Sequence, residues 1–177
     1  PQECVAITQH EFASMVWHTS NRVPSYQNWF EGADLRQVYE SHKRWLQVLQ
    51  WKAPAERWVL KSPGHLWALE SMLAVYPDAR IVQNHRDPLK VVASLVSLVC
   101  TLRSLASDEG SIPEAAAEFA DYIIEGLDRS VTARTDGTIP SDRIIDVQFD
   151  AFMADPFTTI RIVYERLDLE FTEDAET

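Results

Sequence analysis

The sequence lacks the features by which several large classes of protein are identified. No apolar run reaches the ~18 residues of a membrane-spanning helix, so we expect no span. The N-terminal stretch is too polar to be a secretory signal. With only two cysteines, Cys4 and Cys100, the chain has neither a disulfide framework nor a cysteine-based metal motif. These absences favour a cytoplasmic protein without a structural metal.

Positive charge is also scarce. The chain has 16 Lys and Arg against 27 Asp and Glu, a net charge of −11, which argues against broad nucleic-acid binding. An anionic ligand must therefore be held by local basic groups against the general field of the protein. The 177 residues and their 46% hydrophobic content are typical of one globular domain, which we place at 1–177.

Glycine is limited to five residues, and no G-x-x-x-x-G-K-[ST] loop occurs. P-loop kinases and NTPases cradle phosphates with such a loop and hold Mg²⁺ beside it. A phosphotransferase of that type is therefore the less favoured alternative.

What the chain does contain is a pair of strand–turn–helix units between Arg57 and Ser94. The first has a strand at 58–60 and a turn at 62–64, and the second has a strand at 80–83 and a turn at 85–88. Ser62 and Asp87 are the predicted N-caps, and each is followed by Pro at the first helical position. Strands that alternate with helices predict β-α-β units and a parallel sheet.

The polar residues of both units follow the carboxyl ends of the predicted strands, where parallel sheets bind ligands. These residues are Lys61, Ser62, His65, Arg86 and Asp87. Helix N-termini at the same edge add free N–H groups and the positive end of a dipole. The pattern predicts a pocket for a polyanion, with Lys61 and Arg86 at its two turns.

Helical periodicity and turn residues place the other elements. We expect helices over 1–17, 33–51, 89–105, 113–131 and from 155 onward, a third strand over 143–149 and a loop over 19–30. The predicted fold class is α/β, a parallel sheet flanked by helices.

These motifs resemble a known family. The runs K-S-P-G-H-L from Lys61, Y-P-D-A-R-I-V from Tyr76 and H-R-D-P from His85 are similar to those of PAPS-dependent sulfotransferases, above all the bacterial branch. The general resemblance covers about residues 3–170, and its specific part covers residues 61–94. It implies the three-layer, P-loop-NTPase-like fold of that family.

The resemblance also implies roles for individual residues. In the family an Arg, and a Ser eight residues beyond it, hold the 3′-phosphate of the nucleotide, and Arg86 and Ser94 match this pair. Lys61 is the expected cation beside the leaving oxygen, Ser62 an expected cofactor contact, and His65 the nearest candidate for the general base. In the cytosolic branch the His lies two residues after the Lys, whereas here it lies four after.

The implied co-substrate is 3′-phosphoadenosine 5′-phosphosulfate (PAPS), with no metal. The implied acceptor is a hydroxyl or amine of a small molecule, carbohydrate or lipid. The family's loop for the 5′-phosphosulfate is missing from the sequence, so we expect a fragment incomplete at its N-terminus, or a divergent member. Such a chain carries the 3′-phosphate half of the site, with little activity alone, and a non-catalytic nucleotide-binding domain is the main alternative.

Each candidate residue also has a purely structural interpretation. Lys61 could be a solvated charge, Ser62 only an N-cap, and Arg86 one half of a local ion pair with Asp87. Ser94 could bond back to a carbonyl one turn earlier in its helix. A helical His is commonly structural, and His65 should be neutral because an imidazolium would oppose the helix dipole.

Overall fold

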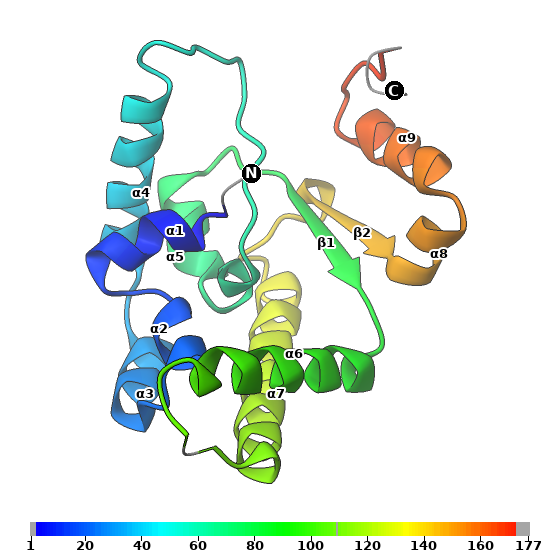
Figure 1. Ribbon diagram of the computed structural model, residues 1–177. Coiled ribbons are helices and arrows are strands. Elements are labelled where there is room, and N and C mark those ends of the chain that lie inside the picture. The colour runs from blue at the N-terminus through cyan, green and yellow to red at the C-terminus, as the bar shows by residue number, and fades with distance from the viewer. Residues whose placement is uncertain (1–2, 109, 173–177) are drawn as a thin grey trace.

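The computed structural model describes residues 3–108 and 110–172, which form a helical body and a small parallel sheet (Figure 1). The α-helices are α1 (Val5–Thr8), α2 (Val16–Ser20), α3 (Pro24–Gly32), α4 (Arg36–Leu49), α5 (Leu69–Val75), α6 (Pro88–Ser104), α7 (Ile112–Thr135), α8 (Phe149–Ala154) and α9 (Pro156–Arg166). Three 3₁₀ turns, η1 (Gln9–Glu11), η2 (Pro63–Trp67) and η3 (Ser141–Arg143), lie between them.

The sheet consists of β1 (Ile81–His85) and β2 (Ile144–Gln148), which pair in parallel from Ile81 opposite Ile144 to His85 opposite Gln148. Side chains of α7 bond to one face of the sheet, and Val163 of α9 packs against the other (Figure 1). The predicted α/β arrangement, a parallel sheet between helices, is confirmed, and so is its third layer.

The strand predicted at Trp58–Leu60 is wrong. These residues have irregular backbone, and Val59 is 95% exposed. A strand is stable only when a neighbour takes up its backbone hydrogen bonds. No strand lies beside this segment in the described part of the chain, so its apolar side chains alone do not make it a strand.

The N-terminal region also differs from the prediction. In place of the helix expected over 1–17 the chain forms α1, η1 and α2, and Phe12, with a left-handed φ of 54°, separates η1 from α2. The first two residues of the expected helix lie outside the described part. The loop expected over 19–30 contains α3, which begins at Pro24. This proline occupies the first helical position, where its missing N–H costs no hydrogen bond, so it favours the start of a helix.

The other predicted helices correspond to α4, α6, α7 and α9, and α8 is an additional short helix. Most of the core lies where α6 crosses α7 and where α4 meets α5, with Val99, Phe119 and Tyr122 almost fully buried. A smaller core, built from Ile145, Val147 and Val163, lies between β2 and α9. In the residues described, no helix is long and apolar enough to span a membrane.

Candidate functional site

The junction of β1 and α6 is built as the sequence predicts. The Asp87 carboxylate accepts a hydrogen bond from the Leu89 N–H at 3.0 Å, and Pro88 occupies the first helical position. Asp87 is therefore the helix cap and not the partner of Arg86. The Arg86 guanidinium lies over the Phe149 ring, 4.6 Å from its centroid. No carboxylate among the described residues pairs with it, so its charge is available to a ligand.

Ser94 lies on the exposed side of α6, and its hydroxyl makes no hydrogen bond within residues 3–108 and 110–172. Lys90, also exposed, precedes it by four residues on the same face of the helix. Residues at this spacing have Cβ atoms ~5–6 Å apart. The first turns of α6 thus carry a cation beside Ser94. The i, i+4 spacing could have revealed Lys90, which the sequence reasoning missed.

A polar network lies under this junction, between the sheet and α7. The Arg134 guanidinium donates to Asp146 at 2.6 and 3.2 Å and to the Gln83 side chain at 2.6 Å. His85 Nε2 lies 2.6 Å from the Asp146 carboxylate, and the Ser130 hydroxyl donates to Gln83. Hydrogen bonds from Arg134 lower the pKa of Asp146 to about 2. These contacts fix the middle of both strands and His85, the last residue of β1, directly before Arg86.

Lys61 lies in a different setting from the one expected. Residues 51–60, directly before it, form no strand, and its carbonyl accepts a hydrogen bond from the Cys4 N–H at 2.9 Å. Its ammonium forms an exposed ion pair with Glu3. The lysine is therefore accessible, but a carboxylate from the N-terminal segment partly neutralises it.

Ser62 caps the turn that follows, since its hydroxyl accepts the Gly64 N–H at 3.1 Å. His65 points inward, and its Nδ1 lies 2.7 Å from the Tyr39 hydroxyl. Its Nε2 is buried without a partner among the described residues. Burial lowers the pKa of His65 to about 4, so the ring is neutral near pH 7. Burial is the main cause of the neutral state of this ring.

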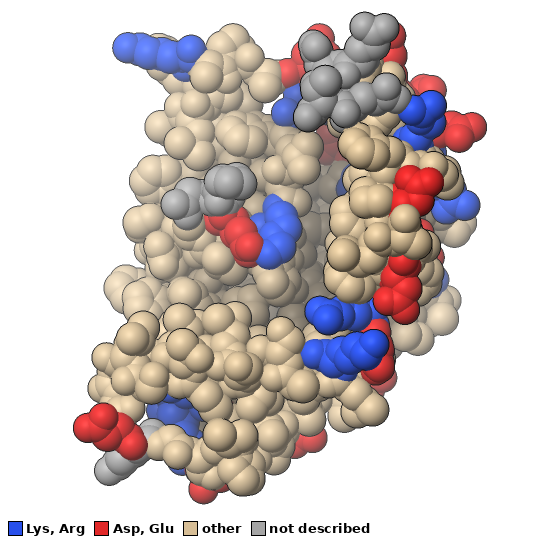
Figure 2. All heavy atoms as spheres, turned by 45° about the vertical axis from the view of Figure 1, so that its right-hand side comes forward, with Lys and Arg blue, Asp and Glu red and all other residues tan. Residues whose placement is uncertain are grey.

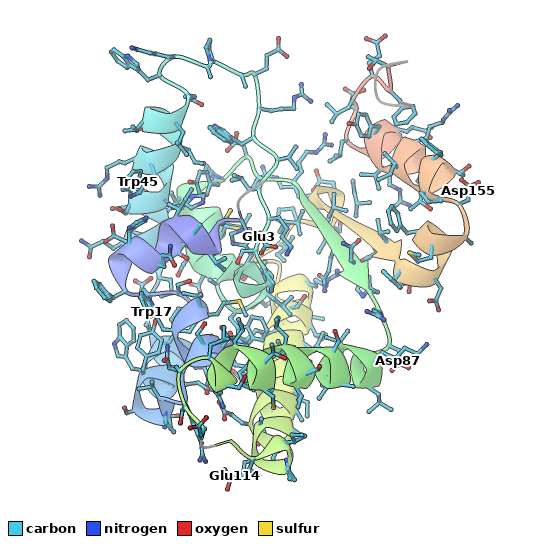
Figure 3. All side chains as sticks on the ribbon, in the orientation of Figure 1. Glu3, Trp17, Trp45, Asp87, Glu114 and Asp155 are labelled. Carbon is cyan, nitrogen blue, oxygen red and sulfur yellow. The ribbon has the colours of Figure 1, made fainter. Side chains whose placement is uncertain are left out.

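The predicted residues therefore form two groups. Arg86 and Ser94 share the β1–α6 junction, while Lys61, Ser62 and His65 share the turn into η2. No hydrogen bond or ion pair joins the two groups in the described part of the chain. In Figure 3, Glu3, the partner of Lys61, lies near the centre, and Asp87 lies beyond the end of β1. Figure 2 shows a hollow on this side of the molecule, with Lys or Arg side chains beside it and at its lower end.

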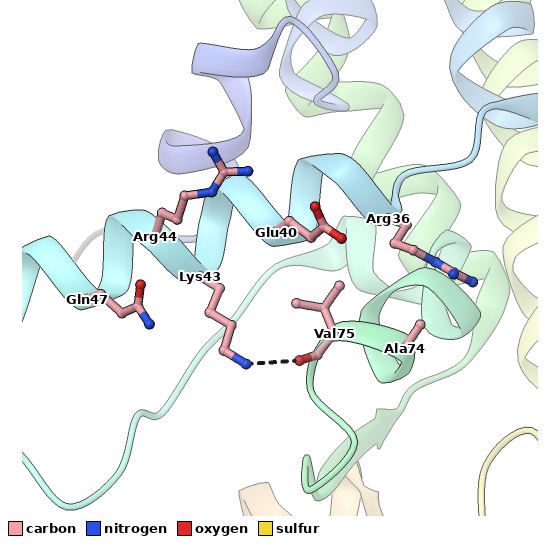
Figure 4. Close-up of a pocket in the computed structure, with 7 residues that line it drawn as sticks. All are labelled: Arg36, Glu40, Lys43, Arg44, Gln47, Ala74 and Val75. Carbon is pink, nitrogen blue, oxygen red and sulfur yellow. Dashed lines mark hydrogen bonds between the residues drawn. The ribbon is translucent and has the colours of Figure 1, made fainter.

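A separate pocket lies away from both groups. It is a shallow depression of about 470 Å³ between α4 and the end of α5, and no predicted site residue lines it (Figure 4). Its lining residues are Arg36, Glu40, Lys43, Arg44, Gln47, Ala74 and Val75. A much smaller cavity of about 20 Å³, beside Ser62 and His65, has room for one water molecule. No three His, Cys, Asp or Glu of residues 3–108 and 110–172 lie together as metal ligands would.

A second histidine, His18, is fully buried among aromatic rings. Neither of its ring nitrogens has a hydrogen-bond partner in the described residues. Burial lowers its pKa to about 4. The unfolded chain binds a proton at this imidazole near pH ~6.5, whereas the folded chain does not until about pH 4.

We therefore expect acid to destabilise the fold. Both His18 and His65 contribute, and the full stability is present above pH ~6.5 and is lost as the pH falls toward 4. Between pH 6.5 and 5 each of these histidines should lower the free energy of unfolding by about 2 kcal/mol. Urea titrations at these pH values measure the loss. Burial also lowers the pKa of His42. His18→Leu should therefore remove the share of this one imidazole, about 2 kcal/mol, and leave the shares of His65 and His42. An unchanged slope in His18→Leu would contradict the assignment.

The comparison with known proteins agrees with the motifs. The sequence profile of the sulfotransferase family matches residues 1–173, almost the whole chain. The chain belongs to the sulfotransferase family. No curated protein sequence matches it significantly.

Two solved sulfotransferases have closely similar folds. They are STF1 from Mycobacterium tuberculosis H37Rv, in its type 1 form, with a TM-score of 0.90, and STF9 from Mycobacterium avium, with a TM-score of 0.89. Each is 32% identical to the chain and matches 99% of it. The chain spans a little under half of each sulfotransferase, 47% of STF1 and 45% of STF9.

Proposed function

We propose that the complete protein transfers a sulfuryl group from PAPS to a hydroxyl or amine, and that this chain carries the 3′-phosphate half of the donor site. The supporting observation is Arg86, an exposed guanidinium without a carboxylate partner among the described residues. It lies at the carboxyl end of β1, directly before the N-terminus of α6. Ligands of α/β sheets bind at this edge. We further propose that residues 1–177 belong to one domain.

In this proposal three side chains hold the 3′-phosphate. Arg86 supplies charge and paired donors, Ser94 supplies a hydroxyl, and Lys90 adds a second cation one turn before Ser94. Charge-assisted hydrogen bonds to phosphate are about twice as strong as neutral ones. The network around Asp146 does not contact the phosphate but holds His85, the residue directly before Arg86, in place.

Lys61 is the proposed electrostatic residue of the transfer step. In sulfuryl transfer the acceptor attacks sulfur while the bridging oxygen of the nucleotide leaves, and negative charge develops on that oxygen. A fixed ammonium there stabilises the transition state more than the ground state. Ser62 is proposed as a further residue that contacts the sulfuryl donor PAPS. For Lys61 to act, its ammonium must exchange the Glu3 carboxylate for the ligand, so Glu3 competes with the donor.

His65 remains the proposed general base, through one defined atom. Its Nδ1 is engaged by Tyr39, so Nε2 takes the acceptor proton in the tautomer whose Nδ1–H donates to the Tyr39 oxygen. A base with a pKa of about 4 accepts protons poorly near neutrality. For His65 to act as the base near neutral pH, a negative charge bound beside the ring would have to raise its pKa.

One observation favours a second function. Because Glu3 pairs with Lys61, the junction that carries Arg86 and Ser94 is the more accessible anion site. A nucleotide-binding domain without catalysis would need only this second site. Turnover distinguishes the two functions. We also propose a cytoplasmic location, supported by Cys4 and Cys100, which are both free thiols. The proposed acceptor is a small molecule, carbohydrate or lipid.

Calorimetry tests the proposed donor site. The protein should bind 3′-phosphoadenosine 5′-phosphate at least tenfold more tightly than adenosine 5′-phosphate, because a charge-assisted contact contributes about 1.5–3 kcal/mol. Arg86→Ala should abolish the preference, and the exposed control Arg166→Ala should retain it. Equal affinity of the unaltered protein for both nucleotides would exclude the assignment.

A further inference from the structure

Two tyrosine–histidine pairs lie next to each other in the interior of the chain, beside the turn into η2. The Tyr39 hydroxyl lies 2.7 Å from His65 Nδ1, and the Tyr76 hydroxyl lies 2.7 Å from His42 Nδ1. Tyr39 and His42 belong to α4, His65 belongs to η2, and Tyr76 directly follows α5. Each pair therefore joins α4 to a different neighbouring segment.

The rings of the two pairs hold one another in place. The Tyr39 ring meets the rings of His42 and Tyr76 edge to face, with centroids 6.1 and 6.4 Å apart. Its exposed fraction is 4%, and that of His42 is 1%. This burial comes from residues of the chain itself, so it does not depend on which surfaces the complete protein covers.

The Tyr39 hydroxyl is the one hydrogen-bond partner of the His65 ring within residues 3–108 and 110–172. His65 Nε2 is buried without a partner there, so the ring is held through Nδ1 alone. A buried polar atom that loses its partner destabilises the fold. Without the hydroxyl neither ring nitrogen would be bonded, and rotation of the imidazole toward water would be favoured.

The ring of His65 is also the inner anchor of the turn that carries Lys61 and Ser62. The Ser62 hydroxyl accepts the Gly64 N–H at 3.1 Å, and the Ser62 carbonyl accepts the His65 N–H at 3.3 Å. Pro63 lies between them and has a fixed φ. Because these short-range bonds make the turn one unit, a shift of the ring displaces Ser62 and the lysine directly before it.

The second pair has the same chemistry but no link to this turn. His42 also has its Nδ1 bonded to a tyrosine and its Nε2 buried without a partner among the residues described. Neither His42 nor Tyr76 forms a side-chain hydrogen bond with the turn in that part of the chain. Loss of the Tyr76 hydroxyl would therefore leave an imidazole unbonded in the same way, but at a place that does not carry Lys61.

We propose that Tyr39 is a positioning residue for sulfuryl transfer, since its hydroxyl holds the His65 ring and, through it, the turn that carries Lys61. The inference rests on the proposed function, in which both of these residues act in the transfer step. In this role the hydroxyl contacts neither donor nor acceptor. A displacement of ~1 Å in a site can lower the rate ~10²-fold, so the tie between α4 and η2 affects the rate.

Tyr39→Phe and Tyr76→Phe in the complete protein test the inference as a matched pair. We expect Tyr39→Phe to lower kcat at least tenfold and Tyr76→Phe to change it less than about twofold. Both variants should bind 3′-phosphoadenosine 5′-phosphate as the unaltered protein does, because Arg86 and Ser94 lie at the β1–α6 junction. Initial rates at saturating donor and acceptor give kcat, and calorimetry gives the affinity.

Two further measurements separate positioning from a general loss of stability. Urea unfolding should show similarly lowered midpoints for Tyr39→Phe and Tyr76→Phe, since each loses one hydroxyl bonded to an imidazole at 2.7 Å. In the Lys61→Ala background, Tyr39→Phe should lower kcat less than it does in the unaltered protein, because the lysine that the turn positions is absent.

The outcomes distinguish the inference from the proposed function. If the unaltered protein transfers sulfuryl groups and Tyr39→Phe matches it, or matches Tyr76→Phe in kcat, the inference is overturned and the proposed function stands. Full additivity of Tyr39→Phe and Lys61→Ala would also overturn it. If the unaltered protein shows no turnover, the proposed function fails and the inference fails with it.

Discussion

Lys61→Ala in the complete protein should lower kcat for sulfuryl transfer about 10²–10³-fold, with a much smaller change in donor affinity. The reason is that the ammonium is proposed to meet charge that develops only in the transition state. Its side chain is exposed and its ion pair with Glu3 lies at the surface, so the substitution should leave the fold intact. Initial rates at saturating donor, together with calorimetric donor affinity, measure the two effects separately.

Glu3→Gln is the control for that experiment. It removes the carboxylate that pairs with Lys61 and leaves the lysine in place. We expect donor affinity to rise or stay constant, since the competing anion is gone. If Lys61→Ala left turnover intact and weakened only binding, the lysine would be a ground-state anchor and the electrostatic role would be wrong.

Gly126→Ala should destabilise the fold by about 1–3 kcal/mol. A Cβ at this position in α7 would lie 2.5 Å from two ring carbons of Trp67. That indole cannot move aside easily, because it stacks on the Tyr122 ring at 4.1 Å and its N–H donates to the Tyr122 carbonyl at 3.2 Å. Equilibrium unfolding in urea measures the loss as a lower midpoint.

Gly32→Ala is the matched control, because no atom lies within 4 Å of the added methyl group and the residue is also helical. It should change stability by less than about 1 kcal/mol. Trp67→Phe in the Gly126→Ala background should recover part of the loss, since it shortens the ring that the methyl group meets. Equal midpoints for Gly126→Ala and Gly32→Ala would show that α7 and η2 can move apart.

The sequence predicts the second strand–turn–helix unit well and the first one poorly. In the second unit β1 pairs with β2, Asp87 caps α6 and Pro88 is the first residue of that helix. The local signals and the pairing of distant strands therefore agree. In the first, Ser62 also caps and Pro63 also opens a helical turn, but the apolar run before them has no strand beside it. Caps depend on a few neighbouring residues, whereas a strand depends on distant ones.

The same distinction applies to the candidate site. Arg86 and Ser94 could be placed from their spacing, because both belong to one turn and one helix. The contact of Asp146 with His85 and Arg134 could not, since it depends on the register of β1 against β2 and on the rotation of α7. The inward orientation of His65 toward Tyr39 likewise requires knowing how α4 packs beside η2.

The separate small core beneath β2 has a consequence for how the molecule opens. β2, α8 and α9 pack on one another and are held to the remainder by the ladder between β1 and β2, with bonds from Arg80 before β1 and from Arg134 to the middle of the ladder. Such a unit can detach while the larger core around Phe119 and Tyr122 stays closed. In native-state hydrogen exchange, the amides of the two strands would then lose protection in one cooperative step, at a lower free energy than those of α7.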